Sequence, residues 1–305
     1  MISNRPPRNA FTLVELMIVI VILGLLASLL VVAAGTMTDS ARSTEDSARL
    51  RSIAMANVSF ATDNDQRLLS PRTEPNIGDP NDPDNPTTTD EQVRRMWVHG
   101  FGNNVSDSGS DRIELSSALS SGAAWEYLGD ETLYKSPLDP TTRIRSYSLN
   151  AFIGVDRCAD EYPAMTVLSS PAYNTRYRLP CPTQASIPQP AKTICAIGEI
   201  LLGFGGYQQT ANVNGWLVSP NPNQPLWTDT PALWNRDFVN ISQMDGSVQS
   251  LRLMHADALR AKIAASGSSH NVLIGASDQD KVDFQTFNSR LLPGVLEFRT
   301  ASDQE

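Results

Sequence analysis

Histidine and cysteine are scarce in this 305-residue chain, which contains only three of each. The histidines lie far apart without metal-ligand spacing, and no Cys-x-x-Cys pair occurs, so nothing indicates a zinc or thioredoxin-like site. The chain also lacks the signatures of zinc peptidases, serine hydrolases, Walker A loops and dinucleotide-binding loops. We therefore predict that the protein is not an enzyme and holds no resident cofactor. The three histidines are His99, His255 and His270, and the three cysteines are Cys158, Cys181 and Cys195.

Basic residues are also in the minority. The chain has 24 Lys and Arg against 33 Asp and Glu, a formal net charge of −9, and no basic cluster. This balance argues against a nucleic-acid partner. Outside the cytoplasm three cysteines allow one disulfide and leave one thiol, and the sequence does not choose among the pairings.

One long hydrophobic run is present near the N-terminus. Nineteen uncharged residues extend from Leu16 to Ala34, and a helix of that length spans roughly 28 Å, close to the thickness of a bilayer core. Arg5 and Arg8 precede the run, so the positive-inside rule places the short head in the cytoplasm. Glu15 lies at the start of the run. A charge within a membrane helix is costly, about 2.5–3.5 kcal/mol at the helix centre, and is therefore a candidate functional residue.

Two general interpretations of this segment are a secretory signal peptide and a plain single-span anchor. Val32-Ala33-Ala34-Gly35 offers a loose signal-peptidase site. The run is longer than the 7–15 residues usual for a signal peptide, and Glu15 stands where a positive charge is typical. A plain anchor explains the length of the run but gives Glu15 no role.

The string RNAFTLVELMIVIVILGLLASLLVVAAG at residues 8–35 resembles the N-terminus of type IV pilins and of type II secretion pseudopilins. The resemblance implies that prepilin peptidase cuts between Ala10 and Phe11 and methylates the new N-terminus. It also implies that Glu15 pairs with the terminal amine of a neighbouring subunit during assembly. The chain departs from the family at Ala10, where glycine is usual.

Periodicity extends the helix beyond the membrane segment. Apolar residues recur at three- and four-residue spacings through residues 36–67, with charges such as Asp46 assigned to the other faces. We predict a cytoplasmic leader (1–10), a transmembrane helix (11–35), its amphipathic continuation (36–67) and an extracytoplasmic globular α+β domain (68–305). The protein is then single-pass in the cytoplasmic (inner) membrane, with its domain periplasmic or extracellular.

Residues 70–90 form a loop rich in Pro, Asp, Asn and Thr. A solvated surface loop explains this composition. The alternative is a calcium site with Asp79, Asp82 and Asp84 as oxygen ligands, and major pseudopilins bind calcium in a loop. A second acidic group near the C-terminus receives the same two interpretations; its members are Asp278, Asp280 and Asp283.

The rest of the chain predicts short helices over 111–128, broken at Gly122 and ending at Gly129, and strands within 147–155, 193–204 and 215–218. Asp245-Gly246 between two strand-like stretches predicts a hairpin with a type I′ turn. Ala256–Ala265 predicts a helix closed by Gly267. The predicted fold class is α+β and pilin-like: a long N-terminal helix on an antiparallel sheet with long loops.

Two further strings are similar to large pilin-like proteins abundant in planctomycetes and their relatives. Residues 133–151 match a "CP-x-D" and "SY-x-x-N" pattern, with Ser136 in place of the usual cysteine, which excludes a disulfide there. Residues 237–253 match a "DG-x-V" hairpin, with Asn235 where a histidine is common.

The sequence therefore predicts a structural assembly subunit, a pseudopilin or minor pilin-like protein, of a type II secretion or type IV pilus-like system. Its partners would be prepilin peptidase, other pilin-like subunits and the cytoplasmic membrane. The alternative is a membrane-tethered binding or hydrolytic domain that uses the same export signal. Trp216, Trp227 and Trp234 could then form a sugar-binding platform, although core packing explains them as well.

Overall fold

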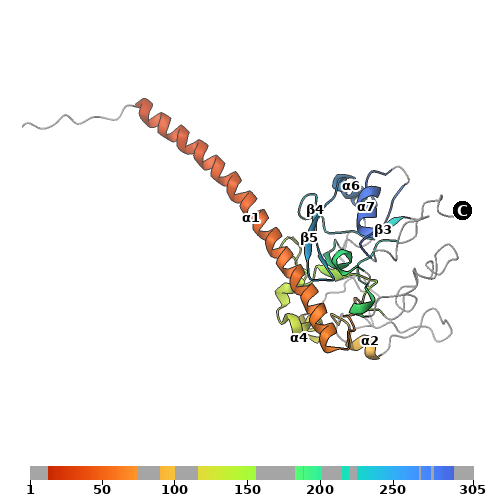
Figure 1. The fold of residues 1–305 in the computed structure, drawn as a ribbon. Helices are drawn as coiled ribbons and strands as arrows, with labels where there is room; N and C mark the ends of the chain where they lie inside the picture. Colours follow the sequence, from red (N-terminus) through yellow and green to blue (C-terminus); the bar gives the residue numbers. More distant parts are fainter. Residues whose placement is uncertain are drawn as a thin grey trace, which may run out of the picture. The chain divides into compact units, whose positions relative to one another are not determined.

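The computed structural model describes residues 13–73, 90–99, 116–155, 183–187, 189–200, 215–219, 225–267, 269–275 and 278–291. The chain divides into two compact units, Met1–Thr44 and Glu45–Glu305. An N-terminal apolar helix is followed by an antiparallel β-sheet domain, so the predicted α+β class is confirmed (Figure 1).

The first helix, α1, is the longest element of the described chain, with 51 residues from Leu13 to Asp63. Among the described residues the shorter helices follow α1, and three of these are single turns of 3-10 type. The α-helices are α2 (Asp90–Arg94), α3 (Ser116–Ser121), α4 (Trp125–Leu128), α6 (Ala256–Ser266) and α7 (Lys281–Asn288). The 3-10 turns are η1 (Glu131–Tyr134), η4 (Gln184–Ser186) and η5 (Pro190–Lys192).

The strands form a four-stranded sheet in the order β1-β2-β4-β5 and a separate pair, β3-β6, and all pairings are antiparallel. Their bounds are β1 (Tyr147–Leu149), β2 (Ile194–Gly198), β3 (Leu226–Asp229), β4 (Phe238–Gln243), β5 (Val248–Arg252) and β6 (His270–Leu273). The C-terminal part of α1 lies along one side of β4 and β5, and α6 and α7 lie on the other side (Figure 1).

The contact between α1 and the sheet is a stripe at helical spacing. Buried positions recur every three or four residues from Asp46 to Ala61, as expected for a helix that buries one face. The prediction that Asp46 belongs to a solvent-facing side is wrong, because its side chain is only 5% exposed. Ala48 and Met55, by contrast, face solvent. The buried members of the stripe are Asp46, Leu50, Ile53, Ala54, Ala56, Asn57, Phe60 and Ala61.

The predicted hairpin at Asp245-Gly246 forms between β4 and β5, but its turn differs from the prediction. The connection between Gln243 and Ser247 has three residues, and the backbone N–H of Gly246 donates to the Gln243 carbonyl at 3.0 Å. Gly246 has φ of +84°, whereas Asp245 does not have a positive φ. A three-residue loop that ends in a left-handed glycine is the next commonest hairpin connection after the two-residue type I′ turn.

Glycines end the short helices where the sequence predicted. Gly129 caps α4 at φ +65°, and Gly267 caps α6 at φ +65°. Gly122 separates α3 from α4 and lies against the backbone of Trp97, where a Cβ atom would come within 2.3 Å of the carbonyl oxygen. The two caps use the left-handed conformation that glycine adopts readily, whereas Gly122 is needed because it has no Cβ atom.

Strand β3 lies outside the segments that the sequence predicts as strands. Leu226–Asp229 is strand β3, paired with β6. Trp227 is fully buried there, and its ring meets those of Phe284 and Phe287 edge-on at centroid distances of 5.5 and 5.7 Å. Helix α7, which supplies both phenylalanines, therefore completes the core on this side.

Candidate functional site

The N-terminal part of α1 presents an apolar surface that no other described residue covers. The segment Leu13–Leu30 is long and apolar enough to cross a membrane, judged by length and composition, and none of it is buried. Exposing that much apolar surface to water is costly, at roughly 25 cal/mol per Å². The segment therefore fits a single-pass membrane anchor.

Glu15 lies in the first turn of α1. It is the single charged residue between Leu13 and Thr38. A carboxylate in a first helical turn interacts favourably with the unpaired N–H groups there. The predicted processing residues Ala10 and Phe11 lie outside the described residues, so the cleavage site stays a prediction. The same holds for the proposed calcium ligands, which are Asp79, Asp82 and Asp84.

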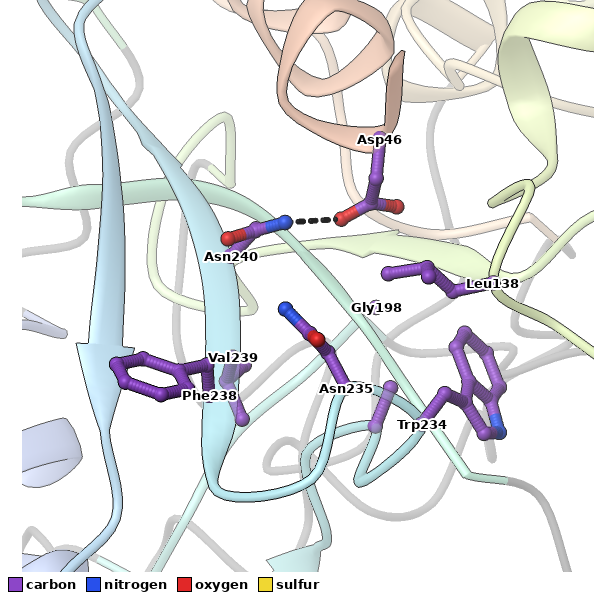
Figure 2. Close-up of a pocket in the computed structure, with 9 residues that line it drawn as sticks. Asp46, Leu138, Gly198, Trp234, Asn235, Phe238, Val239 and Asn240 are labelled. Atoms are coloured by element: carbon purple, nitrogen blue, oxygen red, sulfur yellow. Dashed lines mark hydrogen bonds between the residues drawn. The ribbon is translucent and has the colours of Figure 1, made fainter. Parts of the chain in front are cut away.

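A second arrangement of polar groups lies where α1 meets the sheet. The carboxylate of Asp46 accepts hydrogen bonds from the Ser136 hydroxyl and, at 2.6 Å, from the Tyr147 hydroxyl, both at Oδ1. The side-chain amide of Asn240 donates to Oδ2 at 2.8 Å (Figure 2). All four side chains are at most 5% exposed. We call Asp46, Ser136, Tyr147 and Asn240 the Asp46 cluster.

The Asp46 cluster joins four separate parts of the domain. Asp46 belongs to α1, Ser136 follows η1, Tyr147 begins β1, and Asn240 lies within β4. Burial raises the pKa of Tyr147 well above its usual value, and the charge and hydrogen bond of Asp46 raise it further. The phenol therefore stays protonated and donates its hydrogen bond over the whole physiological range.

Arg49, a cation close to Asp46 on the same helix, makes its ion pair and hydrogen bonds with other groups. Arg49 forms an ion pair with Glu45 and donates to the carbonyls of Thr132 and Lys135 at the end of η1. The three partners of the Asp46 carboxylate are all neutral groups. Hydrogen bonds from neutral donors thus replace water around a charge that burial would otherwise disfavour.

A small pocket borders the Asp46 cluster. Its volume is about 250 Å³ when the open solvent at its mouth is included, which is below the range typical of small-molecule sites. Asn235 lines it, and Ser136 lies in the adjoining cluster, so both positions that depart from the planctomycete-type pattern belong to this region. The lining residues are Asp46, Leu138, Gly198, Ala232, Trp234, Asn235, Phe238, Val239 and Asn240 (Figure 2).

Sequence reasoning missed this cluster although one signal was available. Asp46 lies four residues before Leu50 and seven before Ile53, and it is therefore in phase with the buried stripe. That spacing identifies an acid on the packed face. It does not identify the donors, which lie 90 to 194 residues away in the sequence.

The second acidic group is engaged by protein groups. Asp278 and Asp280 both form ion pairs with Lys262 at 2.6 Å. Burial alone would lower the pKa of Lys262, but the two carboxylates outweigh it and raise that pKa. Asp283 accepts from the backbone N–H groups of Met254 and His255. Within the described residues no group of three or more His, Cys, Asp or Glu side chains could hold a metal ion.

The three tryptophans do not form a platform. Trp216 and Trp227 are completely buried. Trp234 lies under the guanidinium of Arg143, which is 5.2 Å from its ring centre. Core packing is therefore the role of the first two, and cation–π contact that of the third.

Comparison with known proteins gives one match. Residues 5–31 match the family model of the prokaryotic N-terminal methylation motif. No curated protein and no solved structure matches the chain. The matched segment includes the exposed apolar part of α1, Leu13–Leu30, so the chain carries a prepilin-type methylation motif and is pilin-like in this segment.

Proposed function

We propose that the protein is an assembly subunit, a pseudopilin or minor pilin-like component, of a type II secretion or type IV pilus-like system. The observation that carries the proposal is the methylation motif at residues 5–31, which includes the uncovered apolar helical segment Leu13–Leu30 with Glu15 as its sole charge. A helix of this kind serves both as a membrane anchor and as a surface for packing against identical helices.

In this proposal the leader, residues 1–10, lies in the cytoplasm and the segment 11–35 crosses the inner membrane. The domain is then periplasmic or extracellular. Arg5 and Arg8 support this orientation. Prepilin peptidase cuts between Ala10 and Phe11, and the mature chain joins other pilin-like subunits in the membrane.

Glu15 sets the stagger between subunits in this proposal. Cleavage creates an amine at Phe11, about 6 Å from Glu15 along the helix axis at 1.5 Å per residue. A neighbouring subunit shifted along the axis brings its amine to this carboxylate. Any other stagger leaves the carboxylate without its cationic partner at the edge of the hydrocarbon, which is unfavourable.

The proposed role is mechanical and needs neither catalysis nor a cofactor. Calcium bound by Asp79, Asp82 and Asp84 remains the one metal that the sequence suggests. Addition of calcium to the full chain would then raise its unfolding temperature, since a ligand that binds only the folded state stabilises it.

Mass spectrometry of the mature N-terminus tests the processing step. The full chain is expressed with a prepilin peptidase, and we expect the terminal peptide to begin with N-methyl-Phe11. The variant Ala10→Gly, which restores the residue usual in the family, serves as the positive control. A mature chain that starts near Gly35 would refute the proposal, because that start identifies an ordinary signal peptide.

Assembly is tested with Glu15→Ala and Glu15→Gln, each co-expressed with a tagged wild-type copy. Both variants should insert into the membrane but co-purify poorly with wild-type subunits after cross-linking. Val14→Ala, a neighbouring change without charge, is the matched control. Undiminished cross-linking of both Glu15 variants would contradict the registry role. A methylated chain that never cross-links would favour the membrane-tethered binding domain.

A further inference from the structure

The buried stripe of α1 contains two polar residues among apolar ones. Asp46 lies at the first turn of the domain unit, which begins at Glu45, and Asn57 lies three turns later. The side-chain oxygen Oδ1 of Asn57 accepts from the Leu69 backbone N–H at 2.9 Å, and its side-chain amide faces the sulfur of Cys195 at 3.6 Å. Each polar residue thus meets groups that are fixed on the domain.

Apolar side chains alone fix the axial position of a helix poorly. Apolar contacts are non-directional, and Leu50, Ile53 and Ala54 would still face the sheet if the helix moved along its axis by one turn, about 5.4 Å. The same movement would separate the Asp46 carboxylate from all three of its donors. It would leave a charge and several hydroxyl and amide groups buried without partners, and each such group costs about 1–3 kcal/mol or more.

We propose that Asp46 is a positioning residue whose hydrogen bonds to Ser136, Tyr147 and Asn240 fix the axial register of the α1 segment Glu45–Asp63 on the sheet. Because α1 is one continuous helix, this register determines how many helical residues precede the domain. In an assembly of identical subunits a single register would give every domain the same height along the helix. This last step rests on the proposed function, whereas the register itself does not.

The proposal separates specificity from stability. Buried ionic and polar groups can often be replaced by apolar residues of similar volume without loss of stability. An apolar set (Asp46→Leu, Ser136→Ala, Tyr147→Phe and Asn240→Leu) should therefore fold, but it should no longer discriminate between registers. A role in stability alone would predict one register for any folded variant.

Pulsed EPR distance measurement provides the test. Spin labels are attached to the full chain in detergent micelles through Arg51→Cys on α1 and Ala264→Cys on α6, both at exposed positions of the domain unit. The native cysteines are replaced by serine in all samples. We expect a single narrow distance for the wild-type core, and a broadened or second distance for the apolar set. The swapped pair Asp46→Asn with Asn240→Asp, which preserves complementary groups, should restore the single distance.

The outcomes are distinct. A single unchanged distance in the folded apolar set would overturn the proposal. If that set does not fold, Asp46→Leu alone is measured instead, and an unchanged single distance would overturn the proposal equally. The measurement uses isolated subunits, so failure of Phe11 methylation or of subunit cross-linking would refute the proposed function without changing this result.

Discussion

The hydrogen bond between Tyr147 and Asp46 provides the most direct measurement of what holds α1 to the sheet. The two oxygen atoms are 2.6 Å apart, and both side chains are almost completely buried. Hydrogen bonds to charged groups contribute about 1.5–3 kcal/mol to stability. Tyr147→Phe should therefore lower the free energy of unfolding by about 2 kcal/mol.

Asp46→Ala should cost more, about 3–5 kcal/mol, because it leaves the buried donors of the Asp46 cluster without their acceptor. In the double variant the Tyr147 hydroxyl and its acceptor are removed together. The combined cost should then fall short of the sum of the two single costs by about 1.5–3 kcal/mol, which is the coupling energy of the pair.

Urea unfolding of the full chain in micelles, followed by tryptophan fluorescence, gives these values. Trp97, Trp216 and Trp227 are completely buried and report on the core. Tyr127→Phe is the matched control, because Tyr127 also donates to a carboxylate of α1, Asp63, but at an exposed site. It should cost less than about 1 kcal/mol.

The same tyrosine predicts a dependence on alkaline pH. The pKa of Tyr147 is raised in the folded state, first by burial and then by Asp46. Its contribution to stability is therefore complete below the ordinary tyrosine pKa of 10.0 and is lost as the pH rises through the raised value. Tyr147→Phe should reduce the loss of stability above pH 10. A coupling energy under about 0.5 kcal/mol, with an unchanged alkaline profile, would refute the reasoning for the cluster.

Two further predictions concern the domain core. A Cβ atom at Gly154 would lie 1.8 Å from the carbonyl oxygen of Leu69, and φ there is +74°. Gly154→Ala should thus lower the free energy of unfolding by several kcal/mol. Gly129 has φ of +65° but open space around the Cβ position, so Gly129→Ala should lower it by only about 1–2 kcal/mol. Equal melting temperatures of the two variants would contradict this prediction. Burial raises the pKa of the Cys195 thiol to about 11. Iodoacetamide at pH 8 should therefore modify Cys195 only after unfolding, as measured by peptide mass spectrometry. Rapid modification of the native chain would contradict this, because it would show that this part of the core opens.

Local patterns in the sequence predicted several elements correctly. The break at Gly122, the caps at Gly129 and Gly267 and the position of the β4–β5 hairpin all depend on residues within a few positions of one another. The sequence did not predict the turn type at Gly246, because loop length depends on the register of β4 against β5. It also did not predict β3, because Trp227 is ordered by packing against α7, more than fifty residues later in the chain.

By itself the sequence determined the N-terminal segment, where a charge-free run, a single carboxylate and a methylation motif lie within a few turns of one helix. These features need no tertiary contact to be recognised, because length, hydropathy and charge order are properties of neighbouring residues. Only the tertiary structure decided the environment of Asp46. Its donors at residues 136, 147 and 240 come from distant parts of the chain. Without these donors in view, a charged residue on a helix is predicted to face solvent, because no other group is known to replace the water around its carboxylate.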